Sequence, residues 1–133
     1  MPENMNVLIL GSGGREHTLA WKIAESKETD KLFIAPGNAG TAQNGENVDL
    51  DPGDFAAVAE FALASDIGMV VVGPEAPLVS GIHDYFLENA RYNHIPVIGP
   101  VRKAALLEGR KDFAKLFMHR YGIPTAAYRS FTK

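Results

Sequence analysis

A glycine-rich segment followed by charged residues lies close to the beginning of the chain. It reads LGSGGREH, residues 10–17, and continues directly from an aliphatic run that begins at residue 7. Backbone N–H groups and the positive end of a following helix, equivalent to about half an elementary charge, would then face one point. Gly13 and Gly14 therefore predict either a site for an anionic group such as a phosphate or carboxylate, or only a tight turn between strand and helix.

The glycine spacing argues against two common nucleotide-binding loops. The dinucleotide fingerprint G-x-G-x-x-G requires a third glycine, and Glu16 stands at that position. The fingerprint also requires an acidic residue at the end of the second strand, where this chain has Ala35-Pro36. A Walker loop is excluded because no Gly-Lys-Ser/Thr follows the glycines. Arg15 could neutralise a bound phosphate, although a cation is locally unfavourable at the beginning of a helix.

Two further polar loops follow later apolar runs. The segment PGNAG, 36–40, carries Asn38, and the segment GPEAPL, 73–78, carries Glu75 between two prolines that restrict the backbone. Because the carboxyl ends of parallel strands open onto one crevice, we expect these loops to meet the glycine segment. A fixed carboxylate can accept hydrogen bonds from both hydroxyl groups of a ribose. Glu75 is thus a candidate sugar ligand, with a solvated loop charge as the alternative.

Strand-like and helical stretches alternate along the chain with short connections. Aliphatic runs predict buried strands, and apolar residues spaced three and four apart predict amphipathic helices. The expected strands are 7–10, 31–35, 69–72, 95–99 and 125–131, and the expected helices are 15–26, one capped by Asp54, 82–90, 104–108 and 112–121. This alternation predicts an α/β fold, an open and mostly parallel Rossmann-like sheet with helices on both faces.

Composition limits the classes of protein that this chain can belong to. Its 133 residues, 46% of them hydrophobic and 22% charged, can bury the core of one domain. A net charge of −3 without a long basic run gives no case for nucleic-acid binding. The aliphatic runs are far shorter than the ~20 residues that cross a bilayer. The lack of cysteine excludes disulfides and thiolate metal sites and fits a cytoplasmic protein.

Four segments, taken together and in order, resemble the phosphoribosylamine–glycine ligase (glycinamide ribonucleotide synthetase) family. They read LILGSGGREHTLAW, APGNAGTA, VVVGPEAPLVSGI and LEGRKDFAKLFMHRYGIPTAAY. The resemblance implies an N-terminal α/β substrate-binding domain over residues 1–100. Residues 101–133 would form linker helices and the beginning of an ATP-grasp region, whose nucleotide-binding and metal-binding core would lie beyond Lys133.

The same resemblance implies an activity and a set of site residues. The full-length protein would join glycine to 5-phosphoribosylamine with ATP, through a glycyl phosphate, in de novo purine biosynthesis. Mg or Mn would accompany ATP, and both would be bound mainly outside this chain. Phosphoribosylamine would lie against Gly13, Gly14, Arg15, Glu16, Asn38 and Glu75, and Lys111 would face the ATP phosphates. No catalytic or metal-binding residue is expected in this chain, which would be inactive alone, and the full-length protein would be a cytoplasmic monomer acting on small molecules, without nucleic-acid or membrane partners.

Two other functions stay open on the sequence. One is a non-catalytic nucleotide-binding α/β module. The other is an NAD-dependent oxidoreductase domain, which the missing glycine and acidic residue disfavour. The chain also departs from the family at Arg110, where the family usually has a small polar residue. We therefore expect a helix cap to be lost next to Lys111.

Overall fold

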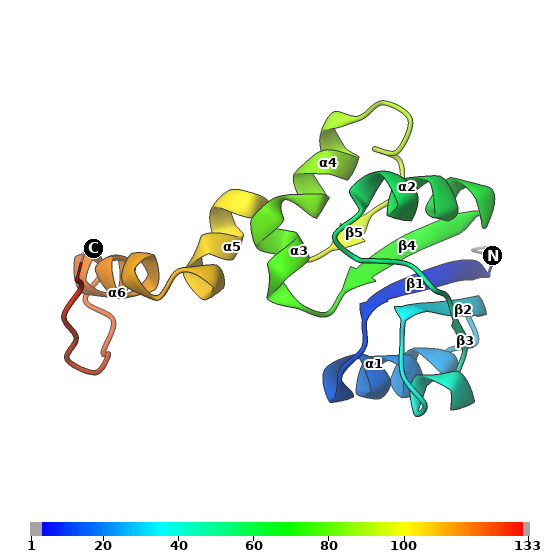
Figure 1. Ribbon diagram of the computed structural model, residues 1–133, viewed down its shortest axis with the longest axis horizontal. Helices are drawn as coiled ribbons and strands as arrows, with labels where there is room; N and C mark the ends of the chain where they lie inside the picture. Colours follow the sequence, from blue (N-terminus) through cyan, green and yellow to red (C-terminus); the bar gives the residue numbers. More distant parts are fainter. Residues whose placement is uncertain (1–3, 132–133) are drawn as a thin grey trace.

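The computed structural model describes residues 4–131, and a single parallel sheet forms its centre (Figure 1). The strands, in the spatial order β3-β2-β1-β4-β5, are β1 (Met5–Gly11), β2 (Thr29–Pro36), β3 (Glu46–Asn47), β4 (Ile67–Val72) and β5 (Val97–Ile98). All four pairings between neighbouring strands are parallel. The strand order reverses between β1 and β4, as in a doubly wound Rossmann-like sheet, which confirms the predicted fold class.

The central strand β1 is buried on both of its faces. Leu8 pairs with Phe33 of β2 and with Val70 of β4. The side chains of residues 7–10 are at most 1% exposed. A strand covered on both faces reads as a continuous aliphatic run rather than as an alternating pattern. The run VLIL therefore predicted this strand correctly.

Helices cover both faces of the sheet (Figure 1). They are α1 (Gly14–Ala24), the short 3-10 helix η1 (Thr41–Gln43), α2 (Phe55–Ala64), α3 (Glu75–Ser80), α4 (Ile82–Glu88), α5 (Arg102–Gly109) and α6 (Lys111–Arg120). On one face, Ala20 of α1 packs with Val7 and Ile9. On the other face, Val58 of α2 and Phe86 of α4 belong to a larger core cluster. The hydrophobic core is therefore split into two layers by the sheet.

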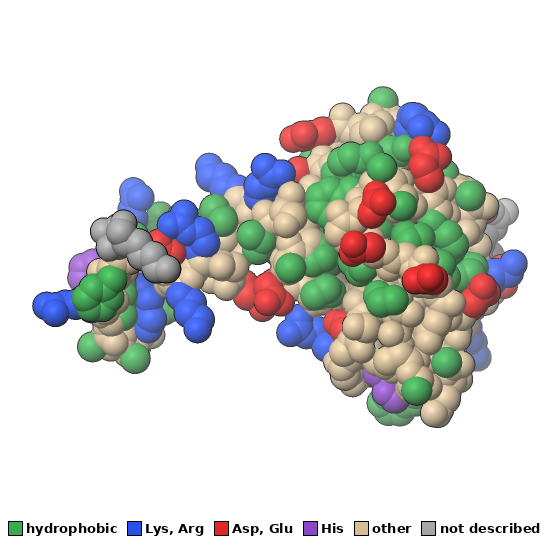
Figure 2. All heavy atoms as spheres, viewed as in Figure 1, with side chains coloured by type: hydrophobic (Ala, Val, Ile, Leu, Met, Phe, Trp, Pro, Cys, Tyr) green, Lys and Arg blue, Asp and Glu red, His purple; other side chains and the backbone are tan. Residues whose placement is uncertain are grey.

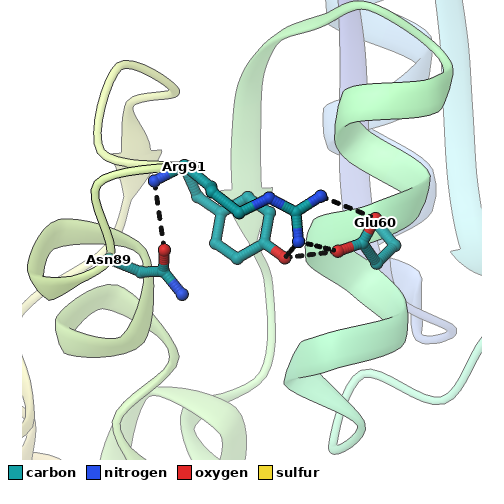
Figure 3. Close-up of polar contacts among 4 residues, drawn as sticks. Glu60, Asn89 and Arg91 are labelled. Carbon is teal, nitrogen blue, oxygen red and sulfur yellow. Dashed lines mark hydrogen bonds and ion pairs between the residues drawn. The ribbon is translucent and has the colours of Figure 1, made fainter.

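A polar cluster joins α2 to the segment that leads into β5 (Figure 3). The Tyr92 hydroxyl donates a hydrogen bond to Glu60 Oε1 at 2.5 Å, and the Arg91 guanidinium donates to both carboxylate oxygens at 2.7 and 3.3 Å. The Tyr92 ring is buried and stacks on Tyr85 of α4. The hydrogen bond from Tyr92, followed by that from Arg91, lowers the pKa of Glu60. This cluster closes the edge of the larger core layer.

The helix α5 is attached to the body of the molecule through α3. Ala105 of α5 is buried, and Gly109 lies so close to Val79 of α3 that a Cβ atom at this glycine would overlap the valine side chain. The Asp84 carboxylate of α4 accepts a hydrogen bond from the backbone N–H of Arg102 at 2.7 Å. This contact satisfies one of the amides that a helix leaves unpaired at its beginning. α5 is thus fixed at both of its ends.

Beyond α5 the chain forms an arm, which we define as α6 and residues 121–131. The arm extends away from the body, and α6 packs chiefly against α5 (Figure 1). Lys and Arg side chains gather around it (Figure 2). Many of its apolar side chains are also exposed, namely Leu116, Phe117, Tyr121, Ile123, Tyr128 and Phe131. The arm therefore contributes little to the core.

The predicted strand at 125–131 is wrong. Within the described residues this segment has no strand partner and no regular secondary structure. It lies beside α6, where Lys115 Nζ donates hydrogen bonds to Thr125 Oγ1 at 2.6 Å and to the Ala126 carbonyl oxygen at 3.1 Å. A strand needs the edge of a sheet to pair with, and the edges of this sheet belong to β3 and β5, away from the arm.

Three short elements were not predicted from the sequence: β3, η1 and α3. The first two span only two and three residues. The third shows that the segment GPEAPL is not a loop throughout, because α3 begins at Glu75 after the N-cap residue Pro74. Pro77 is tolerated there, since the first turn of a helix has no intrahelical partner for its backbone nitrogen. In the part of the chain that the structure describes, no helix is long and apolar enough to cross a membrane.

Candidate functional site

The loops that follow β1, β2 and β4 lie at the same end of the sheet. We call this the loop edge and define it by residues 11–14, 36–40 and 73–75. It includes the point between β1 and β4 at which the strand order reverses. In open parallel sheets this is where ligands bind, because the chain leaves the two strands toward opposite faces and opens a crevice. The topology thus brings the three polar loops of the sequence together.

Glu16 lies inside the loop edge rather than on its surface. Its side chain is 5% exposed, and its Oε2 accepts a hydrogen bond from the Gly13 N–H at 2.6 Å. The side chain fills the space between Gly11 and Gly73, where a Cβ atom on either glycine would overlap it. Gly11 also has a φ of +123°, which disfavours any other residue. The glycines of the loop edge thus accommodate the side chain of Glu16.

Arg15 ties the first loop to the third. Its Nη1 donates a hydrogen bond to the Gly73 carbonyl oxygen at 2.5 Å, and the side chain remains exposed. Gly14, the first residue of α1, faces open space on the side where a Cβ atom would stand. The first amides of a helix have no intrahelical acceptor. Arg15 and Gly14 are therefore among the parts of the first loop that a ligand can approach directly.

Asn38 ties the second loop to the first. Its Nδ2 donates hydrogen bonds to the carbonyl oxygens of Ser12 at 2.9 Å and Gly13 at 3.3 Å. Its Oδ1 accepts from the backbone N–H groups of Gly40 at 2.8 Å and Thr41 at 3.0 Å. The amide side chain thus makes four contacts within the protein, and it sets the distance between the two loops.

Two further residues support these loops, and the sequence reasoning missed one of them, Thr41. Thr41 is fully buried, and its hydroxyl accepts from the Asn38 N–H at 2.7 Å and lies 2.7 Å from Asn47 Oδ1. His17 packs its ring on Gly40, where a Cβ atom would overlap the imidazole. The spacing Asn-x-x-Thr, in which both side chains bond to nearby backbone, is typical of a turn and is the signal that could have identified Thr41.

Glu75 differs from Glu16 in exposure. It is the first residue of α3 and follows β4 by way of Gly73 and Pro74, so it lies at the loop edge with an exposed side chain. A carboxylate in the first turn of a helix is favoured by the helix dipole. Two carboxylates, one buried and one exposed, therefore lie at the loop edge.

Lys111 does not lie at the loop edge. It is the exposed first residue of α6 and, with Lys115, Tyr128 and Arg129, lines a hollow of about 410 Å³ in the arm. The preceding N-cap residue, Arg110, makes no side-chain hydrogen bond to the backbone of α6, as expected. The structure therefore separates Lys111 from the other predicted site residues.

Arg110 bonds instead to the first turn of α6. Its guanidinium reaches both Asp112 carboxylate oxygens, at 3.2 and 2.6 Å. This contact lowers the pKa of Asp112 and raises that of Arg110. A carboxylate in the first turn also favours the helix. Asp112 therefore supplies part of what a missing capping side chain would have given.

The described residues do not fit a metal site. Between residues 4 and 131 no three His, Asp or Glu side chains come close enough to hold an ion. Two apolar hollows lie away from the loop edge, one of about 310 Å³ at the amino-terminal end of the strands and one of about 330 Å³ between α5 and α6. The loop edge is the candidate site because three loops that carry polar side chains meet there, at the reversal of strand order.

Comparison with known proteins identifies relatives of this chain. Residues 5–108 match the family described as "Phosphoribosylglycinamide synthetase, N domain". The phosphoribosylamine–glycine ligase of Allochromatium vinosum is 53% identical over 97% of this chain and 30% of its own length. The bifunctional purine biosynthetic protein ADE1 of Schizosaccharomyces pombe is 49% identical over 98% of this chain and 17% of its own length. The chain thus spans at most about 30% of the length of these relatives.

Solved structures agree with these relatives. The crystal structure of phosphoribosylamine–glycine ligase from Thermotoga maritima matches with a TM-score of 0.59 and 36% identity, over 92% of this chain and 26% of that one. N5-carboxyaminoimidazole ribonucleotide synthetase from Thermus thermophilus matches with a TM-score of 0.64 and 25% identity, over 90% of this chain and 31% of that one. Since the family match covers most of the chain and agrees with its fold, the chain belongs to the phosphoribosylglycinamide synthetase N-domain family.

Proposed function

We propose that this chain is the N-terminal, substrate-binding part of an ATP-dependent ligase that joins glycine to 5-phosphoribosylamine, giving glycinamide ribonucleotide in purine biosynthesis. Its membership of the N-domain family supports the assignment. The observation that carries the binding role is the meeting of three polar loops at the reversal of strand order, tied together by Arg15 and Asn38. The role of this part is to hold phosphoribosylamine.

The proposed reaction has two steps. ATP transfers its terminal phosphoryl group to the glycine carboxylate, and the resulting acyl phosphate is attacked at its carbonyl carbon by the amine of phosphoribosylamine. Phosphate leaves, the amine loses a proton, and the C–N bond of the amide is formed. Such chemistry depends on positioning the amine and excluding water from the acyl phosphate. A pre-organised loop edge supplies the positioning of the amine.

The residues at the loop edge divide into two groups in this proposal. Glu75, Arg15 and the amide of Gly14 contact the ligand, because they are exposed polar groups there. Glu75 accepts hydrogen bonds from ribose hydroxyls or from the amine. Glu16 and Asn38 act as positioning residues, because their side chains are bonded within the protein. Gly13 belongs to the glycine loop itself, and its N–H donates the hydrogen bond that fixes the Glu16 carboxylate.

The remaining components of the reaction are assigned outside the loop edge. ATP and its Mg or Mn would be bound mainly by other parts of the enzyme, and Lys111 would reach the ATP phosphates from the arm. We place the border of the substrate-binding domain near residue 100, with linker helices and the start of an ATP-grasp region over 101–133. The whole enzyme would be a cytoplasmic monomer that acts on small molecules.

The test is a titration of the chain with glycinamide ribonucleotide, the stable product, followed by amide NMR. We expect saturable shifts at residues 12–16, 38–40 and 73–76 and none in the arm. A parallel titration with AMP and NAD distinguishes a general nucleotide-binding module, which would respond equally to them. Shifts confined to other parts of the sheet would contradict the binding role. The chain incubated with phosphoribosylamine, glycine and ATP should release no phosphate above background.

A further inference from the structure

The glycine loop already contains an anion of its own. The Glu16 carboxylate accepts the Gly13 N–H at 2.6 Å, and the side chain is 5% exposed. Gly11 and Gly13, before α1, and Gly73, after β4, all surround this one side chain. A Cβ atom built on Gly11 would lie 2.7 Å from the Glu16 side chain, and one on Gly13 would lie 3.0 Å from Oε2.

The glycine loop to which Glu16 is bonded corresponds to the loop that approaches the pyrophosphate in dinucleotide-binding sheets. In dinucleotide-binding sheets the pyrophosphate lies at the reversal of strand order, against the glycine loop and the beginning of the first helix. The second glycine of the fingerprint lets the backbone approach the pyrophosphate, and the third allows close packing of the helix on the strand. Gly13, whose N–H is bonded to Glu16, stands at the second position here, and Glu16 stands at the third. Here the reversal lies between β1 and β4, next to Gly11 and Gly73.

We propose that Glu16 is a specificity-determining residue, a built-in anion that keeps phosphate groups out of the glycine loop. Three effects act in the same direction. The Gly13 N–H is already bonded, the space between the glycines is filled, and a second anion would be repelled by the carboxylate. The cation of this loop, Arg15, donates to the Gly73 carbonyl oxygen at 2.5 Å and stands at the exposed mouth of the loop.

The inference extends to the class of ligand that the loop accepts. A loop with a carboxylate in its anion position favours uncharged and cationic groups and rejects nucleotide phosphates. This holds whether or not the proposed ligase activity is correct, because it concerns the loop alone. If the proposed function is wrong, glycinamide ribonucleotide will not bind at the loop edge. If this inference is wrong, inorganic anions will bind to the glycine loop of the wild-type protein.

The probe for the test is inorganic pyrophosphate, with amide NMR as the readout. In the wild-type protein the amides of residues 12–15 should not show saturable shifts up to about 10 mM pyrophosphate, which corresponds to affinities weaker than millimolar. In Glu16→Ala the shifts of the same amides should saturate and give an affinity for pyrophosphate at least about tenfold higher than that of the wild type. The reason is that the helix N-terminus is then free to bind the anion. Glu25→Ala is the matched control, since it removes an exposed glutamate at the other end of α1.

A second variant separates charge from volume. Glu16→Gln keeps the size of the side chain and an acceptor for the Gly13 N–H but removes the charge, so pyrophosphate should bind more tightly than to wild type and less tightly than to Glu16→Ala. Circular dichroism and thermal melts establish that each variant is folded. A folded Glu16→Ala that gains no affinity, or an equal gain in Glu25→Ala, would overturn the proposal. If neither Glu16 variant folds, the wild-type titration decides alone, because saturable shifts at residues 12–15 refute an anion-filled loop and their absence supports it.

Discussion

Glu16 and Glu75 are the same residue type at the same loop edge, yet their surroundings differ. Glu16 is enclosed by glycines and bonded to the backbone, so its carboxylate is a fixed part of the loop. Glu75 is exposed at the start of α3. A ligand can donate hydrogen bonds to the Glu75 carboxylate without breaking any that the side chain makes within the protein. The exposed glutamate is therefore the one that should affect binding without affecting stability.

The first prediction concerns Glu75→Gln. Because the side chain is exposed, the free energy of unfolding should change by no more than about 0.5 kcal/mol. Binding of ribose 5-phosphate should weaken by roughly tenfold or more, because hydrogen bonds to charged groups contribute about 1.5–3 kcal/mol. Calorimetric titration and urea denaturation measure the two quantities.

The matched control is Glu88→Gln, at the exposed end of α4. It removes the same charge from the molecule, so it should leave both quantities unchanged. If Glu75→Gln binds ribose 5-phosphate as the wild type does, Glu75 is not a sugar ligand. If that variant is strongly destabilised, the role of Glu75 is structural.

At the scale of elements, the strands β1 and β4 could be predicted because continuous aliphatic runs mark strands buried on both faces. The short elements could not, since two-residue β3 and three-residue η1 are too brief to show a period. The strand expected at 125–131 had suitable residues but no sheet edge nearby. Its outcome depended on tertiary contacts, which override local propensity.

The same distinction applies to the candidate site. The meeting of the three loops followed from the parallel topology, which the alternating pattern predicts. The burial of Glu16 did not, because glutamate is almost always exposed and its burial depends on three glycines from two distant loops. Similarly, Asn38 is a suitable ligand by type. Only the contacts with Ser12 and Thr41 show that its amide is bonded within the protein.

The second prediction concerns the cluster that joins α2 to the segment before β5. Hydrogen bonds from Tyr92 and Arg91 hold the pKa of Glu60 below its usual value of about 4.5. A carboxyl group with a lowered folded-state pKa stabilises the protein above its unfolded pKa, and that stabilisation is lost as the pH falls through the folded value. Tyr92→Phe should therefore raise the pKa of Glu60 and make the loss of stability on acidification smaller.

The measurements for this cluster are the Glu60 side-chain carboxyl ¹³C shift as a function of pH and urea midpoints at neutral pH and at about pH 3. Tyr85→Phe is the matched control, because it removes a neighbouring hydroxyl from the same aromatic stack while Tyr92 keeps its bond to Glu60. An unchanged Glu60 titration in Tyr92→Phe would show that Arg91 alone sets the pKa.

At the scale of the whole molecule, charge and packing both divide the chain near α5. From α5 onward the described residues include only two acidic side chains, Glu108 and Asp112. The Lys and Arg side chains of the same region are more numerous: Arg102, Lys103, Arg110, Lys111, Lys115, Arg120 and Arg129. The body, in contrast, carries most of the acidic side chains of the chain. Most of the large apolar side chains of the arm are also exposed, whereas the body buries a hydrophobic core. The body thus has a core of its own, whereas the arm does not.

The third prediction follows from this division. Native-state hydrogen exchange should show the highest protection in β1 and β4, where the backbone is buried on both faces, and the lowest in residues 121–131. α5 should be intermediate, since it is fixed to α3. The measurement is amide exchange by NMR at neutral pH on the whole chain. Protection of 125–131 equal to that of β4 would mean that the arm is as stable as the body.

The short helix α3 connects the loop edge of the body with α5. It begins at Glu75 on the loop edge and ends at Ser80, whose carbonyl oxygen accepts a hydrogen bond from the Arg102 guanidinium at 3.0 Å. Near its end Val79 packs against Gly109, the last residue of α5. Glu75, the proposed sugar ligand, and the residues that contact α5 therefore lie on one helix of six residues, so a displacement of α5 that carried α3 with it would also move Glu75.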